Sequence, residues 1–231
     1  MGDRRERATP ARRVRRCDPG RTRPGSRRAD ALGLVTAQLV LLTFLAAGLA
    51  GGLLFGGRLG SLGEVRLRWQ ALAIGGLLFQ LLLFSAPAAA IVGAAGAPLY
   101  VGSTLVVLAA VLRNLEQPWF RLIAFGAALN LLAIIGNGGV MPADPAALAA
   151  AGLTHAPGTF SNTAPAGSSP FAFLGDLWAT PAWLPFRNVV SLGDLLIGIG
   201  AAAWVATTMR ARAGRVDSKR APVLRLGKRP V

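Results

Sequence analysis

The chain has 231 residues, of which 53% are hydrophobic, and it carries a formal net charge of +15 at pH 7. Residues 1–30 contain 11 arginines and 4 acids, residues 210–231 contain 8 lysines or arginines and 1 acid, and residues 31–209 contain only 6 arginines and 5 acids. This distribution is typical of a membrane protein and excludes an ordinary soluble domain.

The charge distribution predicts three regions. Residues 1–30 form a basic, disordered extension, residues 31–209 a transmembrane domain, and residues 210–231 a basic cytoplasmic tail. Neither end interleaves aromatic residues with its arginines, and arginine beside a membrane span typically contacts anionic lipid headgroups, at about 1 kcal/mol each. We therefore expect the lipid bilayer and its anionic headgroups as partners, and no nucleic acid.

Long uncharged runs predict helices that cross the bilayer, because a spanning helix needs about 20 apolar residues. The run 69–112 is long enough for two helices, and Ser85, Pro87, Gly93 and Pro98 mark the turn between them. The five predicted spans are 32–56, 69–86, 97–113, 119–137 and 191–209. The predicted fold class is therefore all-α, a polytopic membrane helix bundle with a Pro/Gly-rich segment between spans 4 and 5.

The arginines in the loops predict the orientation. Loops 57–68 and 113–121 and the C-terminal tail are basic, which places them in the cytoplasm and the segment 138–190 outside. Five spans then put the N-terminus outside, against its 11 arginines. We expect translation to start further in, for instance at Leu32 or Val35; the alternative is that span 1 is an export signal, cleaved or retained.

Small and amide residues in the spans predict helix contacts. Gly48, Gly52 and Gly56 form a GxxxGxxxG row in span 1, which predicts either a homo-oligomer seam or close packing within the bundle. Gln38 and Gln80 each lie inside a span, where an amide needs a hydrogen-bond partner on another helix.

Span 4 carries two asparagines that lie seven residues, or two helical turns, apart. Asn130 and Asn137 therefore share a face of the helix. Asn137 precedes Gly138 and Gly139, and this trio suits a helix end because Asn and Gly take the left-handed conformation that closes the last turn. Capping does not explain Asn130, which lies deeper in the span.

The segment 138–190 begins with a predicted short helix, capped by Asp144 and ended by Gly152. Residues 153–170 contain the only histidine, His155, and aromatic residues with prolines follow, as at a membrane interface. Within the segment, Leu-Gly-Asp-Leu at 174–177 repeats as Leu-Gly-Asp-Leu at 192–195.

Span 5 opens with Ser191 and Asp194, which have the spacing of a helix capping pair. An acid in a span also indicates a functional site, because charge in hydrocarbon is costly. The outer ends of spans 4 and 5 and their connection could enclose a polar pocket or form a lid that seals the bundle. The pocket candidates are Asn130, Asn137, His155, Asp176, Ser191 and Asp194, with Gly138, Gly139, Pro142 and Gly193 shaping the turns.

Four motifs carry a family resemblance: "GGRLGSLGEVRLR" (56–68), "LNLLAIIGNGGVMP" (129–142), "FLGD" (173–176) and "NVVSLGDLLIGIG" (188–200). Over roughly residues 35–208 the chain resembles the domain-of-unknown-function 5317 family of bacterial polytopic membrane proteins. The resemblance implies a multi-pass protein of the bacterial cytoplasmic (inner) membrane, and it supplies no activity.

The sequence contains no HExxH, no Gly-x-Ser-x-Gly and no phosphate-binding glycine loop. With one histidine and one cysteine, we expect neither a metal site nor a cofactor. We favour a non-catalytic membrane module that binds a lipid, a small molecule or a partner protein. The alternatives are a transporter or channel component, and a membrane enzyme acting on a lipid with Asp194 or Asp176 as acid or base.

Overall fold

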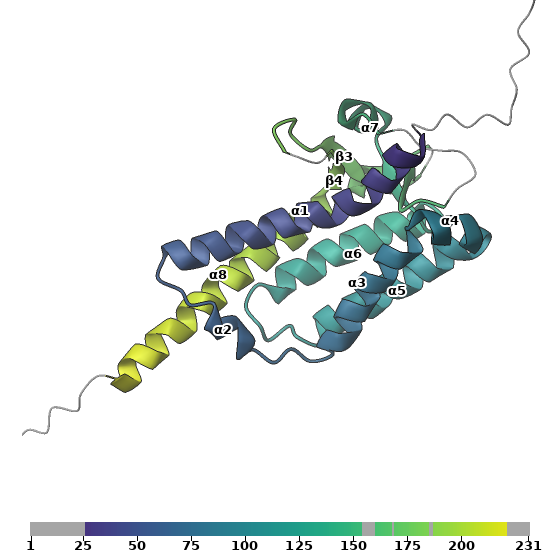
Figure 1. Cartoon of the computed structure of the whole chain (residues 1–231). Helices are drawn as coiled ribbons and strands as arrows, with labels where there is room; N and C mark the ends of the chain where they lie inside the picture. The colour runs from purple at the N-terminus through teal and green to yellow at the C-terminus, as the bar shows by residue number, and fades with distance from the viewer. Residues whose placement is uncertain (1–25, 154–159, 168, 185–186, 221–231) are drawn as a thin grey trace, which may run out of the picture.

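The computed structural model describes residues 26–153, 160–167, 169–184 and 187–220 (Figure 1). Its helices are α1 (Ser26–Leu54), α2 (Gly60–Gly63), α3 (Gln70–Leu83), α4 (Ala86–Val92), η1 (Gly93–Ala95), α5 (Gly96–Leu112), α6 (Phe120–Gly136), α7 (Pro145–Ala151), η2 (Ala172–Leu174) and α8 (Leu192–Arg220). Its strands are β1 (Met141–Ala143), β2 (Thr163–Pro165), β3 (Asp176–Ala179) and β4 (Val189–Ser191).

The long helices α1, α3, α5, α6 and α8 lie at the positions of the five predicted spans. Two stretches of the described chain, Pro87–Leu112 and Leu192–Ala211, are long and apolar enough to cross a membrane. The apolar helices Leu39–Leu54, Gln70–Leu83 and Phe120–Gly136 are shorter. The helix positions are thus confirmed, and the crossing of a bilayer by all five stays a prediction.

The five helices pack as one bundle. Helix α8 packs against both α1 and α6, and α5 packs against both α3 and α6. Figure 1 shows α6 between the α1–α8 pair and the α3–α5 pair. Helix α1 begins at Ser26, so its first turn falls in the region 1–30; residues 1–25, and with them most of the predicted extension, lie outside the described residues.

The glycine row of α1 contacts α8 of the same chain. A Cβ atom built on Gly48 would lie 2.7 Å from Ala202 Cα, and one built on Gly52 would lie 2.6 Å from Met209 Sδ. Gly56 lies beyond the end of α1, with φ +79°. In the described chain, Gly48 and Gly52 therefore serve close packing within the bundle, which was the alternative to a homo-oligomer seam.

Gly48→Ala is expected to lower the free energy of unfolding by about 1–3 kcal/mol, because the added methyl group meets backbone atoms that cannot rotate away. Gly51→Ala is the matched control, since nothing lies within 4 Å of a Cβ at Gly51. This control should be neutral or stabilising by up to about 1 kcal/mol through helix propensity. Unfolding in mixed detergent micelles measures both, and equal effects would contradict tight α1–α8 packing.

A small mixed sheet lies at one end of the bundle, beside α7 (Figure 1). Its strand order is β2-β1-β3-β4; β1 pairs in parallel with β2 and β3, and β3 pairs antiparallel with β4. The all-α prediction missed this sheet. Its strands are only three or four residues long and come from separate parts of a Pro- and Ala-rich segment, so no alternating pattern announces them.

The end of α6 follows the predicted turn, with one difference. Asn137 has φ −108°, and the left-handed positions are Gly138 at φ +71° and Gly139 at φ +94°. The Gly138 N–H donates to the Ile135 carbonyl (3.2 Å) and the Gly139 N–H to the Ile134 carbonyl (2.8 Å). These two hydrogen bonds form a Schellman motif, which satisfies carbonyl groups in the last turn of the helix and turns the chain toward β1.

The short helix predicted after Asp144 is confirmed as α7. Asp144 Oδ1 accepts a hydrogen bond from the Ala146 N–H (3.1 Å), and Pro145 is the first helical residue. Gly152 ends the helix in the left-handed conformation, with φ +66°. Local capping signals therefore define this helix at both ends.

Candidate functional site

A cavity of about 400 Å³ lies between the helices of the bundle and reaches the small sheet. Helices α1, α3, α5, α6 and α8 all contribute to its wall, which is mainly aliphatic and aromatic. Its polar side chains are Arg68, Gln70, Gln80, Tyr100, Thr104, Asn114, Asn130, Asn162, Asp176, Asn188 and Asp194. The mainly apolar cavity thus contains several polar side chains, contributed by different helices and by the sheet.

Asn130, Ser191 and Asp194 form a closed hydrogen-bonded cluster where α6 meets the start of α8. Asn130 Nδ2 donates to Asp194 Oδ1 (2.7 Å), and Ser191 Oγ donates to Asn130 Oδ1 (2.9 Å). The Asp194 N–H donates to Ser191 Oγ (3.0 Å), and the Ser191 N–H donates to Asp194 Oδ2 (3.1 Å). The last two bonds are the predicted capping box, and Asn130 links it to α6.

Gly193 allows this close contact between the two helices. A Cβ atom at this position would lie 2.6 Å from the Gly126 carbonyl oxygen and would collide with the Asn130 side chain. In turn, a Cβ atom built on Gly126 would lie 2.6 Å from the Gly193 carbonyl oxygen. The two glycines therefore bring the α6 and α8 backbones near enough for Asn130 to reach Asp194.

Asp176 lies in β3, is 5% exposed and lines the cavity. Its Oδ2 accepts a hydrogen bond from Thr163 Oγ1 (3.2 Å) in β2, and its backbone pairs with Ser191 across β3 and β4. Among the described residues, no donor is bonded to its Oδ1. Burial, followed by the negative charge of Asp194, holds the pKa of Asp176 well above its usual range, although the Thr163 hydrogen bond acts in the opposite direction.

A second polar group lies deeper, between α3 and α5. Gln80 Nε2 donates to Ser103 Oγ and to Thr104 Oγ1, each at 3.2 Å. Both hydroxyls donate onward to the Tyr100 carbonyl, at 2.8 and 2.9 Å. The interhelical bond predicted for Gln80 is therefore confirmed, while the side chain of Gln38 lies outside the described part of the chain.

Asn114 closes the opposite end of the cavity. Its amide donates to the Arg68 carbonyl (2.8 Å) and to the Ala110 carbonyl (2.7 Å), and its oxygen accepts from the Arg68 N–H (2.8 Å). The residue is 3% exposed. Sequence reasoning missed Asn114; its position directly after a predicted span, where an amide can cap the helix end, was the available signal.

The structure brings together four of the predicted pocket residues: Asn130, Asp176, Ser191 and Asp194. It places Asn137 elsewhere, because its amide donates to the Val140 carbonyl (3.2 Å) and its side chain does not line the cavity. His155 lies outside the described residues. Thr163 and Tyr100 were missed, because only the sheet and the packing of α5 bring them to the site.

The predicted turn residues have distinct positions. Gly138 and Gly139 close α6, Gly193 lies at the α6–α8 contact, and Pro142 is fully buried in β1. Gly175 lies directly against the Pro142 carbonyl, so that a side chain at 175 would collide with β1. Backbone contacts of this kind fix Asp176, the next residue, in the wall of the cavity.

Residues 64–206 match the family described as a family of unknown function (DUF5317). The chain belongs to this family. The matched region includes α3, α5, α6, the sheet and the part of α8 that carries the cluster, and it leaves out α1. It also begins later than the resemblance at residue 35, so the motif 56–68 falls within it only from Glu64. No curated protein and no solved structure shows a significant match to the chain.

Proposed function

We propose that this DUF5317 protein is an integral membrane protein whose five long helices cross the bilayer and enclose a binding site for an amphipathic small molecule. The observation that carries the proposal is the exterior of the bundle, where large apolar side chains are exposed on several helices around a cavity that contains polar groups. A soluble protein rarely exposes a continuous apolar surface of this kind.

The exterior of the bundle is apolar over several helices. Large exposed hydrophobic residues on α3, α5 and α6 include Leu72, Ile74, Leu78, Phe79, Leu82, Leu99, Leu105, Val106, Leu112, Phe125, Leu132 and Ile135. In water, an apolar surface of this extent drives aggregation, whereas lipid tails solvate it. The exterior therefore supports a bilayer as its solvent.

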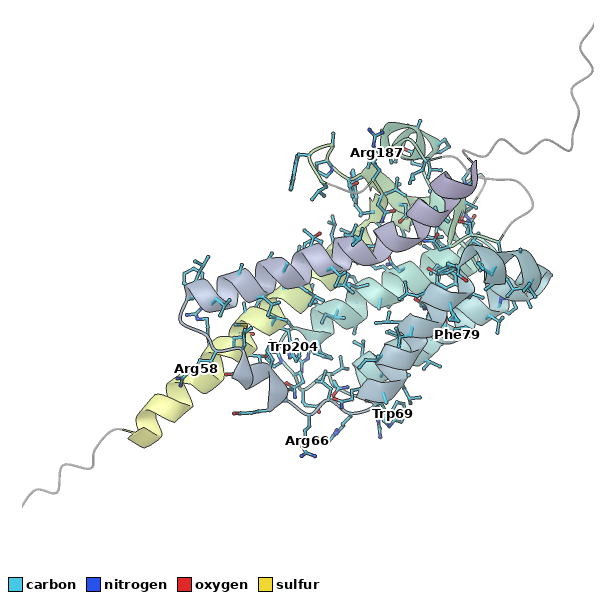
Figure 2. All side chains as sticks on the ribbon, viewed as in Figure 1. Arg58, Arg66, Trp69, Phe79, Arg187 and Trp204 are labelled. Carbon is cyan, nitrogen blue, oxygen red and sulfur yellow. The ribbon has the colours of Figure 1, made fainter. Side chains whose placement is uncertain are left out.

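The two ends of the bundle differ in charge, which supports one orientation. Arg58, Arg66 and Trp69 lie at the end opposite to Arg187 (Figure 2). Trp69 and Trp119 precede α3 and α6 and are about half exposed, as in the aromatic belt at a membrane surface. The basic end suits the cytoplasm, and the sheet then lies outside.

Two details of this orientation have physical consequences. At 1.5 Å per residue, α3 extends about 21 Å and α6 about 26 Å, less than the roughly 30 Å of hydrocarbon, so the bilayer is expected to thin around them. The N-terminal end of α1 lies at the same end of the bundle as the sheet (Figure 1), so the proposed orientation assigns both to the outer side. The conflict with the arginines of residues 1–30 therefore applies to the folded bundle as well.

The hydrogen bonds at the cavity favour binding over catalysis. Both carboxylate oxygens of Asp194 accept hydrogen bonds from Asn130 and Ser191, so this acid is used to hold α8 against α6. Asp176 is then the one carboxylate with a free oxygen among the described cavity residues. A single acid without a partner is a weak basis for acid–base chemistry and a sufficient basis for binding.

Native mass spectrometry of the full chain, released from lipid nanodiscs, tests this proposal. We expect the wild type to carry a bound mass that Ala127→Phe has lost, because Ala127 lines the cavity. Ala128→Phe, at the exposed neighbouring position of α6, is the matched control and should keep the mass. Ala73→Phe fills the cavity from α3 and replaces the first variant if that variant melts early.

Two results would contradict the proposal. One is a wild-type protein that carries no bound mass after gentle release; the other is a mass retained by folded Ala127→Phe and Ala73→Phe. A protein that leaves the membrane fraction in alkaline carbonate would separately contradict its integral membrane character.

A further inference from the structure

We propose that the cavity binds an organic cation, an ammonium group on an apolar body of moderate size, with the ammonium group against Asp176. This inference rests on the proposed function and names the chemical class of its ligand. The charge of the cavity, the free oxygen of Asp176, the aromatic wall and the size of the cavity each support it.

The described wall of the cavity carries two carboxylates, Asp176 and Asp194, and one basic residue, Arg68. The Arg68 side chain is 68% exposed, and its Nη1 lies 3.6 Å from Glu116 Oε1, so its charge is directed to the surface. No described lysine or arginine pairs with either acid. Buried carboxylates without a cation nearby are costly, and a cationic ligand removes this cost.

Asp176 is the acid that is free to meet a ligand. Asp194 has both oxygens occupied, whereas Asp176 has a hydrogen bond at Oδ2 alone in the described structure. Asp176 is 5% exposed and lines the cavity, so a ligand in the cavity lies beside its carboxylate. A carboxylate oxygen at the cavity wall that accepts no hydrogen bond from the protein is available to a donor or a cation on a ligand.

The neighbouring wall suits the apolar body of such a ligand. The rings of Phe84 and Tyr100 meet edge to face, with centroids 4.8 Å apart, and both residues line the cavity. Phe160 stacks on Phe84, with centroids 5.8 Å apart. Aromatic faces attract ammonium groups, and Leu77, Val107 and Ile134 supply aliphatic contacts further in.

The size of the cavity limits the ligand. A volume of about 400 Å³ lies near the lower end of the range for small-molecule sites, roughly 300–1,000 Å³. A two-tailed phospholipid does not fit inside it. The volume therefore favours a compact amine or quaternary ammonium compound over a whole lipid molecule.

Protons compete with such a ligand for Asp176. Two described titratable groups, Asp194 on α8 and Tyr100 on α5, line the same cavity. The Asp144 N–H donates to the Asp176 carbonyl (2.9 Å), but its carboxylate caps α7, and Arg187, before β4, is exposed. Because the pKa of Asp176 is raised, this acid is protonated over a wider pH range than an exposed one. Affinity for a permanent cation should therefore fall as the pH is lowered, by up to about tenfold per pH unit.

The test compares two isosteric probes, benzyltrimethylammonium and its neutral analogue neopentylbenzene, on the full chain in phosphatidylcholine nanodiscs. Calorimetric titration, with empty nanodiscs as the blank, gives each dissociation constant at pH 6 and pH 8. We expect the cation to bind wild type at least about tenfold more tightly than the neutral probe, with the larger margin at pH 8.

Two variants distinguish the effect of the Asp176 carboxylate from the effect of an acid elsewhere on the outer segment. Asp176→Asn should lose the preference for the cation, and Asp144→Asn, an acid on the same outer segment that does not line the cavity, should retain it. Because the probe comparison on wild type needs no variant, a poorly folding Asp176→Asn leaves the test intact. Equal binding of both probes to wild type overturns the cationic class and keeps the proposed function. Binding of neither probe also overturns the cationic class, and the native mass measurement on the wild type then decides the proposed function separately.

Discussion

Asp194→Ala is expected to lower the free energy of unfolding by about 2–5 kcal/mol. The change leaves the Asn130 amide and the Ser191 N–H without acceptors in a buried cluster, and each unpaired buried donor costs about 1–3 kcal/mol. Asp144→Ala is the matched control, because Asp144 also caps a helix but lies at the surface. It should cost only about 1 kcal/mol. Unfolding in mixed detergent micelles gives both values.

A double-mutant cycle shows whether the cluster acts as a unit. Asn130→Ala and Asp194→Ala should be non-additive by about 0.5–3 kcal/mol, since the two residues share one hydrogen-bonded network. Additive effects would mean that the 2.7 Å contact contributes nothing to stability. The position of α8 would then depend on packing of Gly126 and Gly193 alone.

Asn114→Ala is expected to destabilise the protein by about 2–4 kcal/mol. The change removes three hydrogen bonds and leaves the N–H and carbonyl of Arg68 without these partners at the point where the chain enters α3. Glu116→Ala cuts the second link between the same two segments, the 3.6 Å ion pair with the exposed Arg68 side chain. This control should cost less than about 1 kcal/mol.

The stability effects of Asn114→Ala and Glu116→Ala together show which contact holds the loop before α3 against the end of α5. A larger effect of Glu116→Ala would mean that surface charge, and not the buried amide, joins the two segments. The expected result would instead assign to Asn114 the role of holding the loop before α3 against the end of α5.

Much of the helical framework follows from local sequence signals. Uncharged runs mark α1, α3, α5 and α6, and an apolar run after Asp194 marks α8, because a helix is the simplest way to satisfy backbone groups in an apolar segment. Gly138 and Gly139 mark the end of α6, and Asp144 and Gly152 mark both ends of α7. Each signal acts within a few residues, so the sequence alone is enough to place it.

The candidate site was only partly predictable. The spacing of Ser191 and Asp194 predicts the capping box, and Asn130 stands out as an amide deep in an apolar helix. The local signal for Asn137 is the same in kind, yet this residue follows the last turn of α6 and its amide bonds to Val140. Residues that share a helical face in a sequence pattern separate when the helix ends between them.

The sequence by itself determined where the helices lie, how two of them end and that Ser191 and Asp194 cap the start of α8. The tertiary structure decided what those residues meet: the sheet that carries Asp176 to the start of α8, Thr163 at its Oδ2, and Tyr100 in the same wall. These contacts join segments that are far apart in the chain. Their geometry depends on strands of three or four residues and on glycine contacts at Gly175 and Gly193, which have no periodic pattern and form only when the whole bundle packs.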